Sequence, residues 1–440
     1  GTLAVGSTAH SGSGDSRTHT ATVTGSFSAL TTSFANGTRS DLTTSGILLK
    51  AQNDADSTKA ITLGSSGGYD GIGITQKSTE KPVLFNGRRY VGNQSVSRQI
   101  TGFGFQPDLV WVKDRTSANY HALYDSVRGP LLKLSADQSG AEGSSTPDGV
   151  LSFDLDGPTI GWKTGWGFVN ANQDFISWAW KAGGGLTATP TDADGNVPDG
   201  VTSVTQSAST TTGLSITKYT GNSSADGQFT HGLGGLPECI IGRITDAGCG
   251  WFVWHKGLAS SFSGTSHTPA NNEYLRLDEN YQKGQFTGSA VTGTPLKTIT
   301  DAVINLDSTQ STLGGITTPL NKNSGVHILY AWRGIPGVSA FGSYTGQITS
   351  APTSSSDAGY CGFKPKFVMI KCTTAGHSWQ IYDAFRDEDD SAQRYVKANS
   401  GDTEISNADR EVIFTANGFT TDSYVSIGGS GESFIFLAYA

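Results

Sequence analysis

The stretch Pro107-Asp-Leu-Val-Trp-Val-Lys-Asp114 decides the fold, because the chain uses its pattern three times. A proline leads an apolar run that carries a basic side chain six residues later, and the arrangement recurs from Pro237 and from Pro365. Fourteen residues after each proline stands His121, Trp251 or Trp379, and seventeen residues after it stands Tyr124, Trp254 or Tyr382. Identical internal spacing at three places means three copies of one structural unit.

Each copy is framed by two further sequence signals. A Tyr-x-Gly tripeptide precedes each proline, at Tyr90, Tyr219 and Tyr344. An apolar and aromatic run closes each copy, at 175–180, 326–332 and 434–439. The run after the proline is apolar at nearly every position, which predicts a central strand that is buried on both faces.

Composition favours an all-β protein. The 440 residues include 58 Gly and only one Met, and charged residues make up 15%, so good helix formers are scarce. Asp156-Gly157 and Asn417-Gly418 are strong hairpin signals. We therefore expect three tandem copies of a small antiparallel β-sandwich, together with a β-rich arm at the N-terminus.

The spacing divides the chain into five segments. Residues 1–84 lack the repeat and form a Ser/Thr/Gly-rich arm, for which we favour docking on a larger assembly over a loosely folded tail. The first repeat spans 85–184, and 185–212 reads as a polar linker after a glycine run. The second repeat spans 213–335, with an insertion near 260–325 that is expected to replace its hairpin, and the third spans 338–440.

Charge and hydropathy exclude two kinds of partner. The net charge is −8 and no basic cluster stands out, which argues against nucleic acid. No apolar run approaches the length of a membrane span, so membrane insertion is not expected.

Four cysteines fall in the second and third repeats, at Cys239, Cys249, Cys361 and Cys372. A Cys239–Cys249 bridge or a Cys361–Cys372 bridge is conceivable across a hairpin, but free buried thiols are favoured. The first repeat has no cysteine, so the unit needs no disulfide. Zinc-ligand spacing of the Cys-x-x-Cys or Cys/His type is absent, and no metal or other cofactor is expected.

Carboxylates do not form a catalytic pattern. Asp154 and Asp156 share one side of a strand that leads into a turn, where turn and solvation roles are favoured over a glycosidase pair. Asp125 and Arg128, like Asp383 and Arg386, stand three residues apart and predict an ion pair that pins a turn. Motifs for nucleophilic, phosphate-binding or zinc-dependent catalysis are absent, so a non-enzymatic protein is expected.

Two stretches are candidate ligand sites. Trp162 and Trp166 lie on a Gly-rich loop, where exposed flat apolar faces would stack on sugar rings, but packing of both side chains back over the sandwich edge is favoured. Asp192, Asp194 and Asn196 alternate like the first half of a calcium loop. Val197 stands where such a loop needs glycine, which favours a solvated turn.

The first repeat resembles a known family. Its segments 104–115, 121–129, 153–157 and 177–183 are similar to a repeat of tail-fibre-like and other virion structural proteins of marine tailed bacteriophages, including cyanophages. The resemblance is looser over 338–440, looser still over 213–335, and does not cover 1–84. It implies a virion appendage or decoration on the particle surface, and it carries over no site residues.

The leading hypothesis is therefore a tail or head fibre or adhesin that displays β modules for host attachment. Its expected partners are other virion proteins, copies of itself in a homotrimer, and a host surface glycan. A carbohydrate-binding surface protein or a capsid decoration is the alternative. A polysaccharide depolymerase is less favoured, because it needs facing carboxylates in a cleft.

Overall fold

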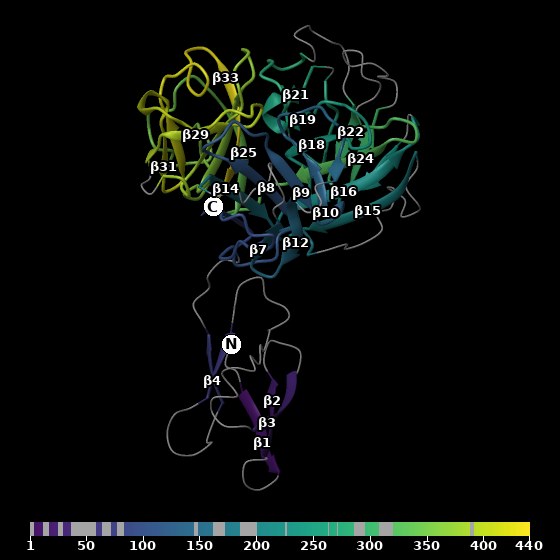
Figure 1. The fold of residues 1–440 in the computed structure, drawn as a ribbon, viewed down its shortest axis with the longest axis vertical. Helices are drawn as coiled ribbons and strands as arrows, with labels where there is room; N and C mark the ends of the chain where they lie inside the picture. The colour runs from purple at the N-terminus through teal and green to yellow at the C-terminus, as the bar shows by residue number, and fades with distance from the viewer. Residues whose placement is uncertain are drawn as a thin grey trace. The chain divides into compact units, whose positions relative to one another are not determined.

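The computed structural model confirms an all-β chain (Figure 1). It describes 4–11, 17–24, 30–36, 59–63 and 72–76 as strands, and 83–440 except 145–147, 162–171, 185–199, 225–226, 263, 271, 286–294, 308–319 and 388–390. Within these residues the helical elements are two three-residue 3-10 turns, η1 (Lys256–Leu258) and η2 (Ala408–Arg410). No helix of the described residues is long and apolar enough to cross a membrane.

The chain separates into two compact units, Gly1–Pro82 and Val83–Ala440. The first contains strands, as expected of the arm. Its antiparallel sheet has the order β1 (Ala4–Ser11), β2 (Arg17–Thr24) and β3 (Leu30–Asn36), and β4 (Lys59–Leu63) pairs with β5 (Ile72–Gln76). The second unit, here called the head, holds all three repeats.

Repeat 1 has one large and one small sheet. The six-stranded sheet runs β11 (Gly143–Ser144), β10 (Gly129–Leu134), β9 (Ala122–Asp125), β8 (Leu109–Asp114), β14 (Asp174–Trp180), β6 (Phe85–Val91). Figure 1 shows β14, β8, β9 and β10 side by side in this order. The small sheet runs β12 (Gly149–Asp154), β13 (Gly157–Gly161), β7 (Arg98–Gln99).

Repeat 2 keeps the scheme and adds a strand. Its large sheet runs β15 (Val201–Ser209), β16 (Leu214–Gly221), β24 (Val326–Trp332), β18 (Cys239–Ile244), β19 (Phe252–His255), β21 (Leu275–Arg276). Its small sheet runs β17 (Gln228–Thr230), β23 (Val303–Leu306), β22 (Leu296–Thr300), β20 (Ser266–His267). The β22–β23 hairpin lies in the insertion, where a replacement hairpin was expected.

Repeat 3 closes the chain. Its large sheet runs β25 (Ser339–Thr345), β33 (Ser433–Tyr439), β26 (Phe367–Cys372), β27 (Gln380–Asp383), β29 (Arg394–Lys397), β30 (Ile405–Ser406). Its small sheet runs β28 (Ser391–Ala392), β31 (Val412–Thr415), β32 (Gly418–Thr421).

The predicted local elements are largely confirmed. The strands after the three prolines, β8, β18 and β26, are buried at every position and lie inside their sheets. The hairpins at Asp156-Gly157 and Asn417-Gly418 form. Gly157 has φ 127° and a side chain there would meet the carbonyl oxygen of Ile100, so glycine is required.

One predicted boundary differs. The segment 185–212 was interpreted as a polar linker, but β15 occupies Val201–Ser209 and pairs with β16 along the edge of the second large sheet. The strand was not predicted because its sequence is rich in Ser and Thr, and without a regular alternation of apolar and polar residues such a segment gives little evidence for a strand.

Each repeat has a core of its own, and the three repeats share a further, central core. Alternate residues of each large sheet face its own small sheet, as Val110 and Val112 do, while Leu109 and Trp111 face the other repeats. The shared cluster takes Trp178 and Trp180 from repeat 1, Tyr330 and Trp332 from repeat 2, and Leu437 and Tyr439 from repeat 3. The head is therefore a closed arrangement of three sandwiches around a common centre.

Candidate functional sites

Three buried cations connect the repeats in a cycle. They are the basic residues that recur six positions after each proline, and all three are fully buried. Each donates to a backbone carbonyl of the neighbouring repeat: Lys113 to Gly401 at 3.0 Å, Arg243 to Ser139 at 3.0 Å, and Lys371 to Asn280 at 3.3 Å. Burial lowers the pKa of Lys113 to about 8 and that of Lys371 to about 7. The repeated charge thus serves the junctions between repeats.

The repeated ring residues form a second cycle. His121, Trp251 and Trp379 are fully buried, and each contacts a backbone carbonyl of a neighbouring repeat. The His121 Nε2 of repeat 1 lies 2.9 Å from the Lys397 carbonyl of repeat 3. The Trp251 Nε1 donates to the Ser135 carbonyl of repeat 1 at 2.7 Å, and the Trp379 Nε1 donates to the Arg276 carbonyl of repeat 2 at 2.7 Å. Trp111 Nε1 donates to His121 Nδ1 at 2.8 Å, so Nε2 carries the proton and donates to Lys397. Trp251 and Trp254 of repeat 2 are both fully buried.

The predicted Asp–Arg ion pairs form and receive a third partner. Asp125 pairs with Arg128 at 2.5 Å and accepts from the Tyr330 hydroxyl of repeat 2 at 2.7 Å. Asp383 pairs with Arg386 at 2.7 Å and accepts from Trp178 Nε1 of repeat 1 at 3.0 Å. The ion pair was predictable from spacing, but its partner on another repeat was not.

The junction between repeats 2 and 3 has different residues at the positions of the aspartate and the arginine. His255 stands in the place of the aspartate, and Leu258 in the place of the arginine. His255 Nδ1 accepts from the Gly257 N–H at 3.0 Å, and Nε2 contacts the Phe436 carbonyl of repeat 3 at 3.1 Å. Leu437 replaces the Trp or Tyr donor and joins Leu258 in the shared core. Donor, acceptor and cation have changed together.

These contacts limit what the repeated residues can do. The recurring cations, rings and carboxylates are buried against neighbouring repeats. The Asp154–Asp156 pair also has structural partners: Asp156 accepts from Gly102 N at 2.8 Å and Gly104 N at 2.6 Å, and Asp154 accepts from Ser152 Oγ at 3.0 Å. Asp154 thus serves its hairpin, as favoured, whereas Asp156 binds the Gly102–Gly104 segment outside it. The recurring cations, rings and carboxylates are therefore not presented at the surface of the head.

A groove of about 590 Å³ lies on the surface of the head. It runs along β25 of repeat 3 and meets Glu238 and Lys256 of repeat 2, which form a 2.7 Å ion pair. Tyr360 and Asp357 lie on its wall. Hydrogen bonds from the backbone N–H groups of Thr353 and Ser354 lower the pKa of Asp357 to about 2. Aromatic, anionic and cationic groups thus line one open surface, which sequence spacing did not indicate.

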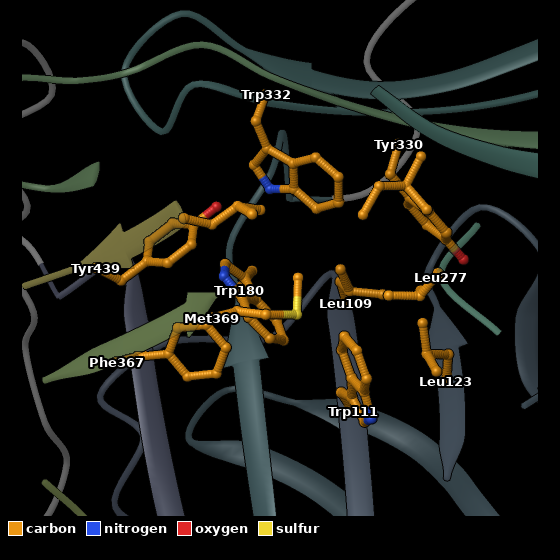
Figure 2. Close-up of a pocket in the computed structure, with 12 residues that line it drawn as sticks. Leu109, Trp111, Leu123, Trp180, Leu277, Tyr330, Trp332, Phe367, Met369 and Tyr439 are labelled. Atoms are coloured by element: carbon orange, nitrogen blue, oxygen red, sulfur yellow. The ribbon is translucent and has the colours of Figure 1, made fainter. Parts of the chain in front are cut away.

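A second cavity lies where the three large sheets meet (Figure 2). It measures about 30 Å³ and is lined by side chains of all three repeats, including Trp111, Trp332, Met369 and Tyr439. Figure 2 shows these side chains surrounding the space. Its wall is apolar and its size is near that of one water molecule, which would need two or more polar partners. The cavity is a packing feature of the shared core.

The predicted ligand residues lie outside the described residues. This holds for Trp162 and Trp166, and for Asp192, Asp194 and Asn196. All four cysteines are free and buried, as favoured, so neither conceivable disulfide forms. Among the described residues, Cys372, His377 and Glu432 bring three metal-ligating atoms within 4.8 Å of one another.

Comparison with known proteins gives one match. The profile of a family described as "Domain of unknown function (DUF7483)" matches residues 82–440, which cover the three repeats. Neither curated proteins nor solved structures give a match.

We predict that the buried network of Asp125, Arg128 and Tyr330 contributes strongly to stability, and that the residues used at the junction between repeats 2 and 3 can take its place. Asp125→Ala removes the buried carboxylate of Arg128 and leaves the guanidinium paired with the partly exposed Glu142 at 3.0 Å, and should lower the free energy of unfolding by about 3–5 kcal/mol. The triple change Asp125→His, Arg128→Leu, Tyr330→Leu copies the junction between repeats 2 and 3 and should recover much of that loss. Denaturant unfolding measures both. Asp154→Ala is the control in the hairpin, and a triple variant no more stable than Asp125→Ala would contradict the account.

We also predict acid sensitivity at the junctions. Burial, helped by nearby Lys113, lowers the pKa of His121 to about 3, and burial lowers that of His255 to about 3. Their folded pKa values lie below the unfolded value of about 6.5, so the stabilisation is complete above pH 6.5 and is lost as pH falls toward 3. Unfolding free energy should therefore fall between pH 6.5 and 4.

The matched variant is His121→Gln, which keeps one donor and one acceptor but does not titrate. It should be less stable at pH 7, with a shallower loss on acidification, by on the order of 1–3 kcal/mol at pH 4. Asp137 accepts from the backbone N–H of residue 121 at 3.0 Å, and burial raises its pKa to about 6. Its protonation therefore opposes the loss of stability on acidification, in both proteins. Parallel pH curves for the two proteins would refute the assignment.

Proposed function

The chain belongs to the DUF7483 family over residues 82–440, and we propose that it is a non-enzymatic attachment protein of a bacteriophage particle. In this proposal the head binds a component of the host surface, and residues 1–82 connect it to other virion proteins. The particle surface is its place of action.

One observation carries the proposal. The side chains that recur in all three repeats, and that would carry any repeated chemistry, are buried in contacts between repeats. The recurring polar residues hold the three repeats together in a closed head, and the repeats differ from one another in their loops and at the groove. Rigid scaffolds with variable surface segments are suited to recognition.

The sequence resemblance to virion structural repeats of marine tailed phages supports the same proposal. It rests on the stretch 104–115 and its companions in repeat 1, where Lys113 and Trp111 now have structural roles. The net charge of −8 fits a protein that works among other proteins and glycans instead of nucleic acid.

Carbohydrate binding is the second candidate, and the groove favours it. A sugar needs an apolar ring face and polar groups around it, which Tyr360, Asp357 and the Glu238–Lys256 pair supply. The groove does not resemble the site of a depolymerase. Glycoside hydrolysis needs one carboxyl that is protonated, whereas Asp357 has its pKa lowered to about 2 and Glu238 is paired with Lys256.

The assembly role predicts a mass difference between two forms. The full chain should form a homotrimer through its arm, and residues 83–440 should be a monomer, because the three repeats already cover one another within one chain. Size-exclusion chromatography with light scattering measures both. A monomeric full chain would argue against a fibre and favour a decoration protein that orders its arm only on a partner.

The recognition role predicts selective loss of glycan binding. Tyr360→Ala removes an aromatic face from the groove. It should weaken binding at least tenfold for each glycan that the wild-type chain binds on a glycan array. Tyr120→Ala is the control, since Tyr120 is 52% exposed on repeat 1 away from the groove residues. Equal binding by both variants would exclude the groove as the glycan site.

A further inference from the structure

A corner of repeat 3 gathers three different metal-ligating side chains. Cys372 is the last residue of β26, His377 lies in the turn that follows, and Glu432 directly precedes β33. The Cys372 Sγ lies 3.7 Å from Glu432 Oε2, and the His377 Nε2 lies 3.3 Å from Glu432 Oε1. Three separate segments of the chain therefore meet at one point.

The separations fit a tetrahedral zinc site. Zinc binds sulfur at about 2.3 Å and nitrogen or oxygen at about 2.0–2.2 Å, which places tetrahedral neighbours about 3.4–3.6 Å apart. The His377 Nε2–Glu432 Oε1 distance of 3.3 Å and the Cys372 Sγ–Glu432 Oε2 distance of 3.7 Å lie close to these values. They end on the two different oxygens of the carboxylate, and one ligand atom from each of the three residues lies within 4.8 Å of the others. His377 and Glu432 are 26% and 23% exposed in their side chains, which leaves an approach from solvent and room for a water as fourth ligand.

The equivalent corner of repeat 1 shows what these positions do elsewhere. Register places Asp114 at the position of Cys372, because Asp114 faces Phe175 as Cys372 faces Phe434. There Asp114 Oδ2 accepts from Asn119 Nδ2 at 2.7 Å, and Asn119 occupies the position of His377. A carboxylate and an amide thus hold the turn together in repeat 1.

Repeat 3 has different side chains at these positions. Gln173 of repeat 1 corresponds to Glu432, so Asp, Asn and Gln have become Cys, His and Glu at three positions. Repeat 2 has Ile244, Cys249 and Gly325 at these places and offers no such set. The combined change supplies a soft thiolate, an imidazole and a carboxylate in bonding range.

We propose that Cys372, His377 and Glu432 bind a zinc ion that fastens the turn after β26 to the start of β33. On binding, the thiol gives up its proton to solvent and the sulfur, the imidazole nitrogen and a carboxylate oxygen coordinate the ion, with water in the fourth position. The two negative ligands balance the charge of the ion. This inference does not depend on the proposed attachment function.

The test uses the untagged full chain and zinc itself. After equilibrium dialysis against zinc and removal of excess, metal analysis should give one zinc per chain, and zinc should raise the melting temperature. Cys372→Ser and His377→Ala should each weaken zinc binding at least tenfold, while Asn119→Ala in repeat 1 and Cys361→Ser should leave it unchanged. Glu432→Gln, at a partly exposed position, provides a folded variant if Cys372→Ser does not fold.

Cobalt gives an independent reading of the sulfur ligand. A near-ultraviolet thiolate-to-cobalt absorption band should appear in the wild-type chain and in Asn119→Ala, and should be absent from Cys372→Ser. A wild-type chain that retains no zinc would overturn the proposal. Stoichiometric zinc that persists unchanged in Cys372→Ser and His377→Ala would overturn it as well, since the ion would then lie elsewhere.

Discussion

Each large sheet of the head buries both of its faces, and its own repeat covers only one of them. The other face depends on the large sheets of the two neighbouring repeats, through aromatic residues such as Trp178, Trp180 and Trp332. An aromatic side chain buries about 150–250 Å², so exposing one costs on the order of 4–6 kcal/mol. A solitary repeat would expose several. The three repeats are consequently obliged to fold as one body, unlike a solenoid in which each repeat contacts only its neighbours along the chain.

The spacing of residues in the sequence predicted the repeated structural unit, but it could not predict how the three repeats pack around a common centre. The central strands, the Asp-Gly and Asn-Gly hairpins and the Asp125–Arg128 ion pair are local features, each specified by residues within one repeat. Closure around a common centre depends on contacts between repeats that lie more than a hundred positions apart, such as Trp178 with Asp383. The one signal available was the basic residue within an apolar strand, because a buried cation must find partners, and Lys113 finds a carbonyl on repeat 3. The groove along β25 had no signal at all, since its wall is assembled from two repeats.

The pseudo-equivalence of the junctions also separates structural residues from those free to diverge. Where all three repeats keep a role, the residue types vary within narrow chemical limits, as with Lys113, Arg243 and Lys371. Where a role is abandoned, the partners change together, as with His255, Leu258 and Leu437, because a buried guanidinium without its carboxylate would be costly. Concerted change at positions that touch is therefore a physical requirement of a low-dielectric junction.

The divergent features concentrate on one side of the ring. The groove and the His255–Leu258 version of the Asp–Arg position both lie between repeats 2 and 3. The turn that carries His377 borders the same junction, where Lys283 N donates to the Thr373 carbonyl at 3.0 Å. The other two junctions hold the buried Asp–Arg networks, whose rearrangement would break charged hydrogen bonds. Two junctions thus hold a buried charged network at this position, whereas the third holds His255 and Leu258 there and differs in its surface chemistry. A closed ring tolerates such a difference because two junctions already hold every repeat in place, so the surface chemistry of the third junction can differ without opening the core.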